Sequence, residues 1–429
     1  MTFLVNTPVG RTLLGAGLAF LVVLGVLSLR GDESPSSAPA RAPELGSVRP
    51  STASTSAEIR RLQAAVRRAP SAVGPRVALA GEDLQRVRET GDPGFYARAE
   101  TLLRGVLARD RDNADALVAL GGLALSRHDF RGGLTLARRA DAGLAALPVE
   151  VDALVELGRY DEAERVLQRL ADLKPNLATY ARVSYFRELH GELRGAARAL
   201  VLASAAGGPA PENTAAIDVL RGDLALVRSR PAEARAAYAR ALATAPRYAP
   251  AEAGRARLAA YEGDTGEAIR RWRGVVARLP LPEYVIGLGE AELAAGRVRA
   301  AREDFALVRV QQQLQARAGV NTDVELAVFE SDHGDRARGL ELARRAWAAA
   351  PSVRSADALG WALTRSGRRD EGLRWARRAR RLGSADPQFA FHAGMAARGA
   401  ERQRLLRFAL DHGLAARPWQ TQQAREALR

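Results

Sequence analysis

The sequence predicts an all-α protein built as a helical-repeat solenoid, with one apolar helix near its N-terminus. Ala, Leu, Arg and Glu are abundant while aromatic residues make up only 5%, which favours helix over strand along the whole chain. Turn residues recur with a period near 34 positions. The chain has 429 residues, 47% of them hydrophobic, so it can bury a core, and a solenoid of this length need not be divided into globular domains.

An uncharged apolar stretch runs from Thr12 to Leu29 between two arginines. As a helix, its 18 residues would span about 27 Å, which is just enough to cross a bilayer core. A cleavable signal peptide usually has a shorter apolar region, although residues 38–40 (Ala-Pro-Ala) offer a poor cleavage site. We therefore expect residues 1–30 to be a membrane anchor or signal-anchor of a single-pass protein of the cell membrane.

Residues 31–57 are rich in Ser, Pro and Ala and show no apolar periodicity, so we expect a disordered linker. Its r.m.s. reach would be about 30 Å. Three of the four arginines near the apolar stretch lie on its C-terminal side, which by the positive-inside rule favours a cytoplasmic repeat region. The short, almost acid-free leader resembles a signal-anchor that would export the repeats, and we expect export.

Helical pairs are expected from residue 58 to residue 429. The turns between the two helices of a pair are separated by 33, 38, 34, 33, 38 and 33 positions. The turn residues are Gly158, Gly191, Ser229, Gly263, Gly296, Gly334 and Gly367.

Residues of fixed size follow each turn. Five positions later stands a small residue: Ala163, Ala196, Ala234, Ala268, Ala301, Gly339 or Gly372. Nine positions later stands a mostly larger one, among them Leu167, Leu200, Tyr238, Trp272 and Phe305. We expect the small residue to let the two helices of a pair approach closely and the larger one to fill the space between successive repeats. Prolines further on should end the second helix.

The segments LGRYDEAERVLQRLADLKP, SRPAEARAAYARALATAP and GRVRAAREDFALV resemble the second helices, with their preceding turns, of tetratricopeptide repeats (TPR). The chain thus resembles membrane-anchored bacterial TPR proteins over about residues 83–383, and more weakly over residues 58–429. The resemblance implies a right-handed superhelix that binds protein partners, without naming one. The early tryptophan that is usual in TPR first helices is missing throughout.

Two of the spacings exceed the period, so insertions at residues 207–211 and 311–315 should each lengthen a loop or a helix end. From about residue 387 the regular spacing is lost. Residues 387–429 are therefore expected to form a divergent terminal repeat that covers the open end of the stack. About nine repeats fit between residues 83 and 429.

No catalytic, cofactor or metal chemistry is predicted, so the protein should not be an enzyme. The chain contains no cysteine, which excludes thiolate zinc sites and cysteine nucleophiles. His128, His190 and His333 fall at turns of three different repeats, so they should not converge. His392 and His412 have no carboxylate at metal-ligand spacing.

The first helices of the pairs should line a concave surface that binds a protein or peptide partner. If the superhelix is like that of its relatives, this surface bears Tyr185, Glu188, Arg257, Glu290 and Trp361. The two aromatic residues are candidate anchors, although packing between repeats would explain them equally well. The lysine and asparagine pattern by which some TPR proteins hold a partner's C-terminal carboxylate is missing.

Arginine supplies the alternative. The formal net charge is +15, and Arg374, Arg377, Arg378 and Arg381 have the spacing of one helical face. This convex face could bind an anionic polymer or lipid head groups, although a solvated repeat surface is the plainer explanation. No recognised nucleic-acid motif accompanies these arginines, so nucleic acid is not expected as the main ligand. The preferred function is a membrane-tethered scaffold or adaptor that recruits a protein partner.

Overall fold

The computed structural model describes residues 55–208 and 211–429, and the regular structure within these ranges is helical. After α2 (Thr55–Arg68), the helices from α3 to α22 form ten consecutive pairs, which we number from the N-terminus. The first helices are α3 (Val73–Thr90), α5 (Ala114–Ser126), α7 (Leu147–Glu156), α9 (Leu177–Leu189), α11 (Pro211–Val227), α13 (Ala249–Tyr261), α15 (Pro282–Ala294), α17 (Asp323–His333), α19 (Val353–Arg365) and α21 (Pro387–Ala396). The second helices are α4 (Gly94–Leu107), α6 (Phe130–Arg139), α8 (Tyr160–Leu173), α10 (Leu193–Ala206), α12 (Pro231–Thr244), α14 (Thr265–Val276), α16 (Val298–Arg317), α18 (Arg336–Ala349), α20 (Arg369–Ala379) and α22 (Gly399–Asp411). Two short 3-10 helices, η1 (Gly143–Ala145) and η2 (Leu414–Ala416), and α23 (Pro418–Ala427) complete the described chain.

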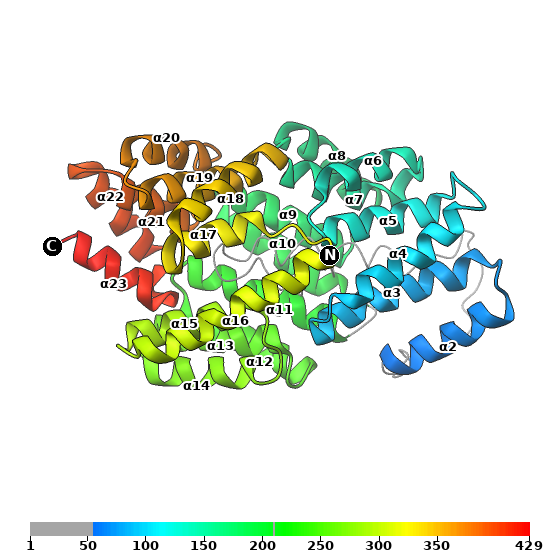
Figure 1. Cartoon of the computed structure of the whole chain (residues 1–429), viewed down its shortest axis with the longest axis horizontal. Coiled ribbons are helices and arrows are strands. Elements are labelled where there is room, and N and C mark those ends of the chain that lie inside the picture. The colour runs from blue at the N-terminus through cyan, green and yellow to red at the C-terminus, as the bar shows by residue number, and fades with distance from the viewer. Residues whose placement is uncertain (1–54, 209–210) are drawn as a thin grey trace.

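The predicted all-α repeat of paired, TPR-like helices is confirmed (Figure 1). The structure has ten pairs where the sequence led us to expect about nine, because the first pair already begins at Val73. The 311–315 insertion lengthens a helix, since it lies within α16. The predicted anchor at residues 1–30 lies outside the described residues, and none of the described helices is long and apolar enough to cross a membrane.

Six of the seven predicted turn residues have a left-handed backbone, which glycine adopts without steric cost. Their φ values run from 54° at Ser229 to 86° at Gly263. Gly334 is the exception, with φ −144°. There α17 ends at His333, and the Asp335 side chain begins the next helix by accepting hydrogen bonds from the backbone N–H groups of Ala337 and Arg338.

Aromatic residues of the second helices pack against glycines of the first helices. The ring of Tyr238 in α12 lies between Gly222 in α11 and Gly254 in α13, where an added Cβ would come within 2.4 Å and 2.3 Å of ring atoms. Trp272 and Phe305 pack in the same way on Gly287 and Gly289. The alanines expected at the close approach of the two helices, such as Ala234 and Ala268, are fully buried.

Replacing Gly254 by alanine should therefore destabilise the protein, because the new methyl group would collide with the Tyr238 ring. We expect a loss of about 1–3 kcal/mol in the free energy of unfolding. Gly274→Ala in α14 is the matched control, since no atom lies within 4 Å of the added Cβ. Alanine there should raise the free energy of unfolding by about 0.5–1 kcal/mol. Urea denaturation measures both, and equal changes would contradict this packing.

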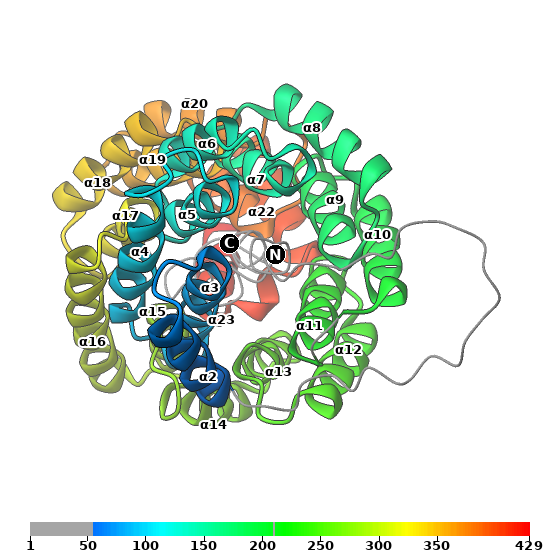
Figure 2. The same ribbon diagram turned by 90° about the vertical axis from the view of Figure 1, so that its right-hand side faces the viewer.

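The superhelix completes a turn, and its second turn packs against its first. Viewed along the long axis, the pairs form a ring, with the first helices inside and the second helices outside (Figure 2). His128 Nδ1 donates a hydrogen bond to the carbonyl oxygen of Asn321 (2.6 Å), and the N–H of Val353 donates to the Tyr160 hydroxyl (3.0 Å), in each case across 193 residues. Between five and six repeats of about 34 residues therefore make one turn.

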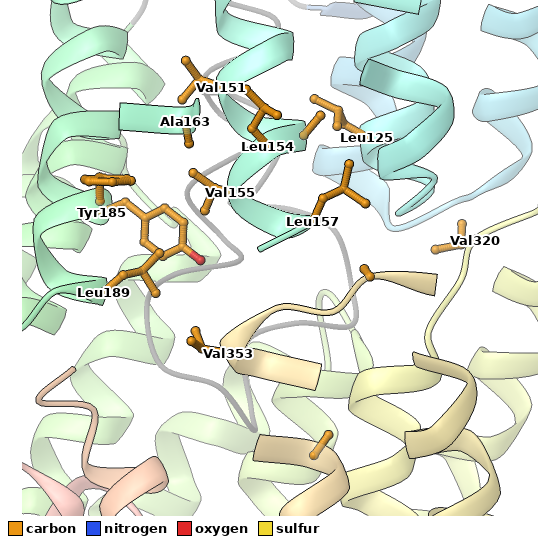
Figure 3. Packing of buried hydrophobic residues seen from close by; sticks show 14 of the residues in the cluster. Leu125, Val151, Leu154, Val155, Leu157, Ala163, Tyr185, Leu189, Val320 and Val353 are labelled. Carbon is orange, nitrogen blue, oxygen red and sulfur yellow. The ribbon is translucent and has the colours of Figure 1, made fainter. Parts of the chain in front are cut away.

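We call this contact between successive turns the seam. On the first turn it comprises Arg127, His128, Arg131, Gly158, Tyr160 and Gly191; on the second, Asn321, Ala348, Ala349, Pro351, Val353 and Gly383. Apolar residues also cross it, since Val320 and Val353 belong to the same buried cluster as Leu157 and Leu189 (Figure 3). The seam is thus part of the core and joins pairs that lie far apart in the sequence.

The C-terminal elements differ from the expectation of a helix that covers the open end. α21 and α22 form a regular pair, but η2 and α23 then turn inward. α23 contacts α15 of the seventh pair more than it contacts α21 or α22, and it lies within the ring in Figure 2. The last helix therefore covers part of the inner surface.

Candidate partner-binding site

Two adjoining cavities lie where the first helices of pairs four to seven meet the C-terminal elements. They have volumes of about 110 Å³ and about 30 Å³ and share Arg257, Ala416 and Arg417 in their walls. We call them the inner cavities. Four of the five predicted groove residues lie in their walls: Tyr185 and Glu188 in the larger, Glu290 in the smaller, and Arg257 in both. The cavities thus bring together residues of three first helices, α9, α13 and α15.

Trp361, the fifth predicted groove residue, is only 1% exposed and does not line the inner cavities. Its Nε1 donates to Asp332 Oδ1 (3.1 Å) and its ring stacks on His392, with centroids 4.2 Å apart. Tyr185 is 4% exposed and its hydroxyl donates to Glu156 Oε1 (3.1 Å). Their burial fits packing between repeats and does not fit the exposed anchors proposed from the sequence.

Arg257 is held by Asp223, a neighbour on the inner surface. Its Nη2 lies 2.5 Å from Asp223 Oδ1, and the same oxygen accepts a hydrogen bond from the Tyr238 hydroxyl (2.7 Å). Burial alone would lower the pKa of Arg257, but the Asp223 carboxylate more than offsets this and the pKa is raised. The inner surface therefore carries a fixed positive charge beside a fixed carboxylate.

The larger inner cavity also holds a carboxyl group that is mostly neutral at pH 7. Burial raises the pKa of Glu188 to about 8, although a hydrogen bond from Ser184 Oγ (3.1 Å) partly offsets it. Burial also raises the pKa of Asp386 and lowers that of Arg417. This surface carries hydrogen-bond donors, hydrogen-bond acceptors and charges of both signs. It therefore suits a polar segment such as a peptide backbone better than a purely anionic ligand.

A further cavity, of about 380 Å³, lies at the seam, and Arg354 lines both it and the larger inner cavity. Arg354 Nε lies 4.0 Å from Glu156 Oε1, and its guanidinium lies 5.6 Å from the centre of the Tyr185 ring. Burial raises the pKa of Glu325 to about 8 and lowers that of His128 to about 4. At pH 7 two of the titratable groups in this cavity, Glu325 and His128, are therefore uncharged, and they lie beside arginines of both turns, among them Arg131 and Arg354.

The arginines of the alternative patch lie on the outside, but not on a single helical face. Arg374, Arg377 and Arg378 are exposed on α20, while Arg381 lies beyond its last residue, Ala379. The chain leaves the helix there to reach the seam, and the Arg381 guanidinium lies 5.1 Å from the centre of the Tyr160 ring.

Two of these arginines already have partners within the chain. Arg377 Nη2 lies 2.8 Å from Glu401 Oε2, and Arg378 lies over the rings of Trp347 and Trp375. The Glu401 carboxylate offsets the charge of Arg377, whereas Arg378 keeps its charge but is held against the two rings.

The histidines pack against aromatic rings or contact polar groups of neighbouring helices in the part of the chain that the structure describes. His333 stacks on Phe305, with centroids 4.3 Å apart, and His392 Nδ1 lies 2.8 Å from Asp357 Oδ2. Within residues 55–208 and 211–429, no three or more His, Cys, Asp or Glu side chains are grouped so that they could hold a metal ion.

The predicted groove set left out Asp223 and Glu283, which lie on the first helices α11 and α15. It also left out three charged residues from other parts of the chain: Arg354, Asp386 and Arg417. They come from the second turn and from the segment before α23. The repeat period gives the equivalent positions within one turn but not which residues of the next turn face them, so no local signal could have found them.

No family model matches this chain, and no curated protein matches it in sequence. Among solved structures, a tetratricopeptide repeat protein from Parabacteroides merdae ATCC 43184 is 18% identical and has a TM-score of 0.41, with 56% of this chain and 98% of that chain covered. A chain of the APC/C hetero-tetramer Cut9–Hcn1 is 15% identical and has a TM-score of 0.32, with 87% of this chain and 93% of that chain covered. The human IFIT1 dimer with PPP-AAAA is 14% identical and has a TM-score of 0.45, with 76% of this chain and 78% of that chain covered. The description of this chain as TPR-like rests on its own helix pairs.

Proposed function

We propose that this protein is a scaffold that binds a segment of a protein partner on the inner surface of its superhelix, at the inner cavities. The observation that carries the proposal is the convergence of Glu188, Asp223, Arg257 and Arg417, which come from three helix pairs and the C-terminal elements. Paired charges beside polar and apolar walls are typical of sites that orient a peptide.

Photo-crosslinking tests the proposal by the place of contact. A photo-reactive residue at position 188 reports on the inner surface, and one at position 377 is the matched outer control, exposed on α20. In a mild-detergent extract of the source cells, a partner should crosslink from position 188 and not from position 377. Binding should also persist when salt rises from about 50 to 200 mM, since recognition in a groove depends less on counterion release than binding to an anionic polymer does.

The opposite result supports the alternative function. If crosslinks form only from position 377 and binding collapses with salt, the outer arginines bind an anionic polymer or lipid head groups and the inner-surface proposal is wrong. Loss of that binding in the triple variant Arg374→Ala, Arg377→Ala and Arg378→Ala would then identify the patch.

We also propose that Thr12 to Leu29 tethers the scaffold to the cell membrane, with the repeats exported. The support is the length of this apolar stretch. Full-length protein should fractionate with membranes, and deletion of residues 1–31 should release a helical, soluble protein. Recovery of the full-length product in the soluble fraction, with an N-terminus near Arg41, would show a cleaved signal peptide instead.

A further inference from the structure

The inner surface of pairs seven and eight is already covered by α23, a helix of the same chain. Gln420 Nε2 of α23 donates to Glu290 Oε1 of α15 (2.8 Å), and both side chains are buried. Gln422 Nε2 donates to the carbonyl oxygen of Ala294 at the end of α15 (2.8 Å). The Trp419 ring packs on His333 of α17, with centroids 4.6 Å apart.

The hydrogen bonds of this contact come from glutamines, and its apolar part consists of the half-buried Trp419 with Ala424, Ala427 and Leu428. The buried residues of α23 are Gln420, Thr421 and Ala424, of which only alanine is apolar. A helix of ten residues is too short to be stable alone in water, where about 12–15 residues are marginal. α23 therefore owes its helical form to docking, and a short terminal element whose fully buried side chains are mostly polar opens at lower free energy than the core does.

The covered surface adjoins the proposed partner site. Arg417, just before α23, lines both inner cavities, and Glu290, which accepts the Gln420 hydrogen bond, lines the smaller one. His333 Nε2 also lies 3.2 Å from Glu290 Oε1. Glu290 therefore touches both Gln420 of α23 and the histidine on which Trp419 packs. Departure of α23 would widen the inner surface from α15 to α17.

We propose that α23 is a displaceable internal ligand, and that the partner segment is a short helix of the same chemistry: an aromatic residue followed directly by glutamine, with a second glutamine two positions later. The proposal rests on the proposed function and names its partner class. The aromatic ring would pack on His333, and the glutamines would donate to Glu290 and to the end of α15. α23 must leave before such a helix binds, so the intact chain is self-inhibited.

Gln420→Glu in the full-length protein tests this idea. At pH 8 the new carboxylate would face the buried Glu290, and the repulsion should release α23 without altering the inner surface. Hydrogen exchange should show loss of protection in α23 alone. Arg425→Glu is the matched control, because it places a carboxylate on the exposed side of the same helix.

The probe is a fluorescent peptide of residues 414–429. It should bind the Gln420→Glu protein at least about tenfold more tightly than the wild-type or Arg425→Glu proteins. In the latter two, α23 occupies the site in most molecules, so few can bind the peptide. The same peptide carrying Trp419→Ala and Gln420→Ala should not bind. Fluorescence anisotropy measures all of these affinities.

Three outcomes would overturn the proposal: protection of α23 that survives in the Gln420→Glu protein, a released α23 with no binding of the peptide, and equal binding of the peptide to all three proteins. Because the probe is a segment of this chain, such a failure leaves the scaffold proposal to be judged separately by crosslinking from position 188.

Discussion

Replacing Gly158 and Gly191 together by alanine should open the seam and separate the two turns of the superhelix. Both residues have left-handed backbone, with φ 72° and 74°. A Cβ at either would lie 2.3 Å from a carbonyl oxygen of the second turn, that of Pro351 or that of Gly383. Backbone oxygens cannot move aside as flexible side chains do, so the turns must part.

The control for this change is Gly263→Ala with Gly296→Ala. These glycines have similar φ values, 86° and 75°, but nothing lies within 4 Å of the added Cβ. In both double variants, backbone strain should lower the free energy of unfolding by roughly 1–2 kcal/mol per site. The seam variant should lose about 2–6 kcal/mol more and should show a larger radius of gyration in X-ray scattering. Equal losses and equal radii would contradict the contact between turns.

Glu325→Gln should stabilise the protein at alkaline pH and have little effect at pH 5. Glu325 lies in the wall of the seam cavity, 3% exposed, and its Oε2 has no hydrogen-bond partner among the described residues. Burial raises its pKa from 4.5 to about 8, so the folded protein holds this proton more tightly than the unfolded chain does. The wild-type protein therefore loses stability as pH rises from about 4.5 to about 8, and the full cost is present above pH 8.

Glutamine resembles the neutral acid and avoids this cost. The gain in the free energy of unfolding should appear between pH 5 and pH 8 and should be on the order of a few kcal/mol at pH 9. Glu188 should still lower stability in the same window, because burial raises its pKa to about 8 as well. Urea denaturation from pH 5 to pH 9 measures the gain. Glu164→Gln, exposed on α8, is the control, and a gain for Glu325→Gln that does not depend on pH would contradict the assigned protonation.

The repeat architecture could be predicted because its determinants are local. A turn residue, a small residue and a large residue at fixed spacings recur in each pair, and the structure places them as packing requires, as Tyr238 between Gly222 and Gly254 shows. The same period relates Tyr185, Arg257 and Glu290, all of which line the inner cavities. Trp361 shows the limit of this reasoning, because a position on a first helix does not say whether its side chain faces the inner surface or the next repeat.

The seam could not be predicted, because the pitch of a solenoid is the sum of small rotations between neighbouring repeats. No spacing in the sequence shows that Arg131 meets Ala349 or that Arg354 approaches Glu156. The inward course of α23 was missed for a similar reason: the chain reverses after Gly413 and binds the seventh pair instead of extending the stack.

Crosslinking of a cysteine pair across the seam tests the closed superhelix most directly. The chain has no cysteine, so Arg131→Cys with Ala349→Cys introduces a unique pair at exposed positions, where the Arg131 side chain now donates to the Ala349 carbonyl oxygen (3.0 Å). A short bis-maleimide at high dilution should join the two within one molecule. The control pair, Arg131→Cys with Arg235→Cys on α12 across the ring, should stay unjoined. Failure of the first pair to crosslink within one molecule would mean that the two turns do not touch.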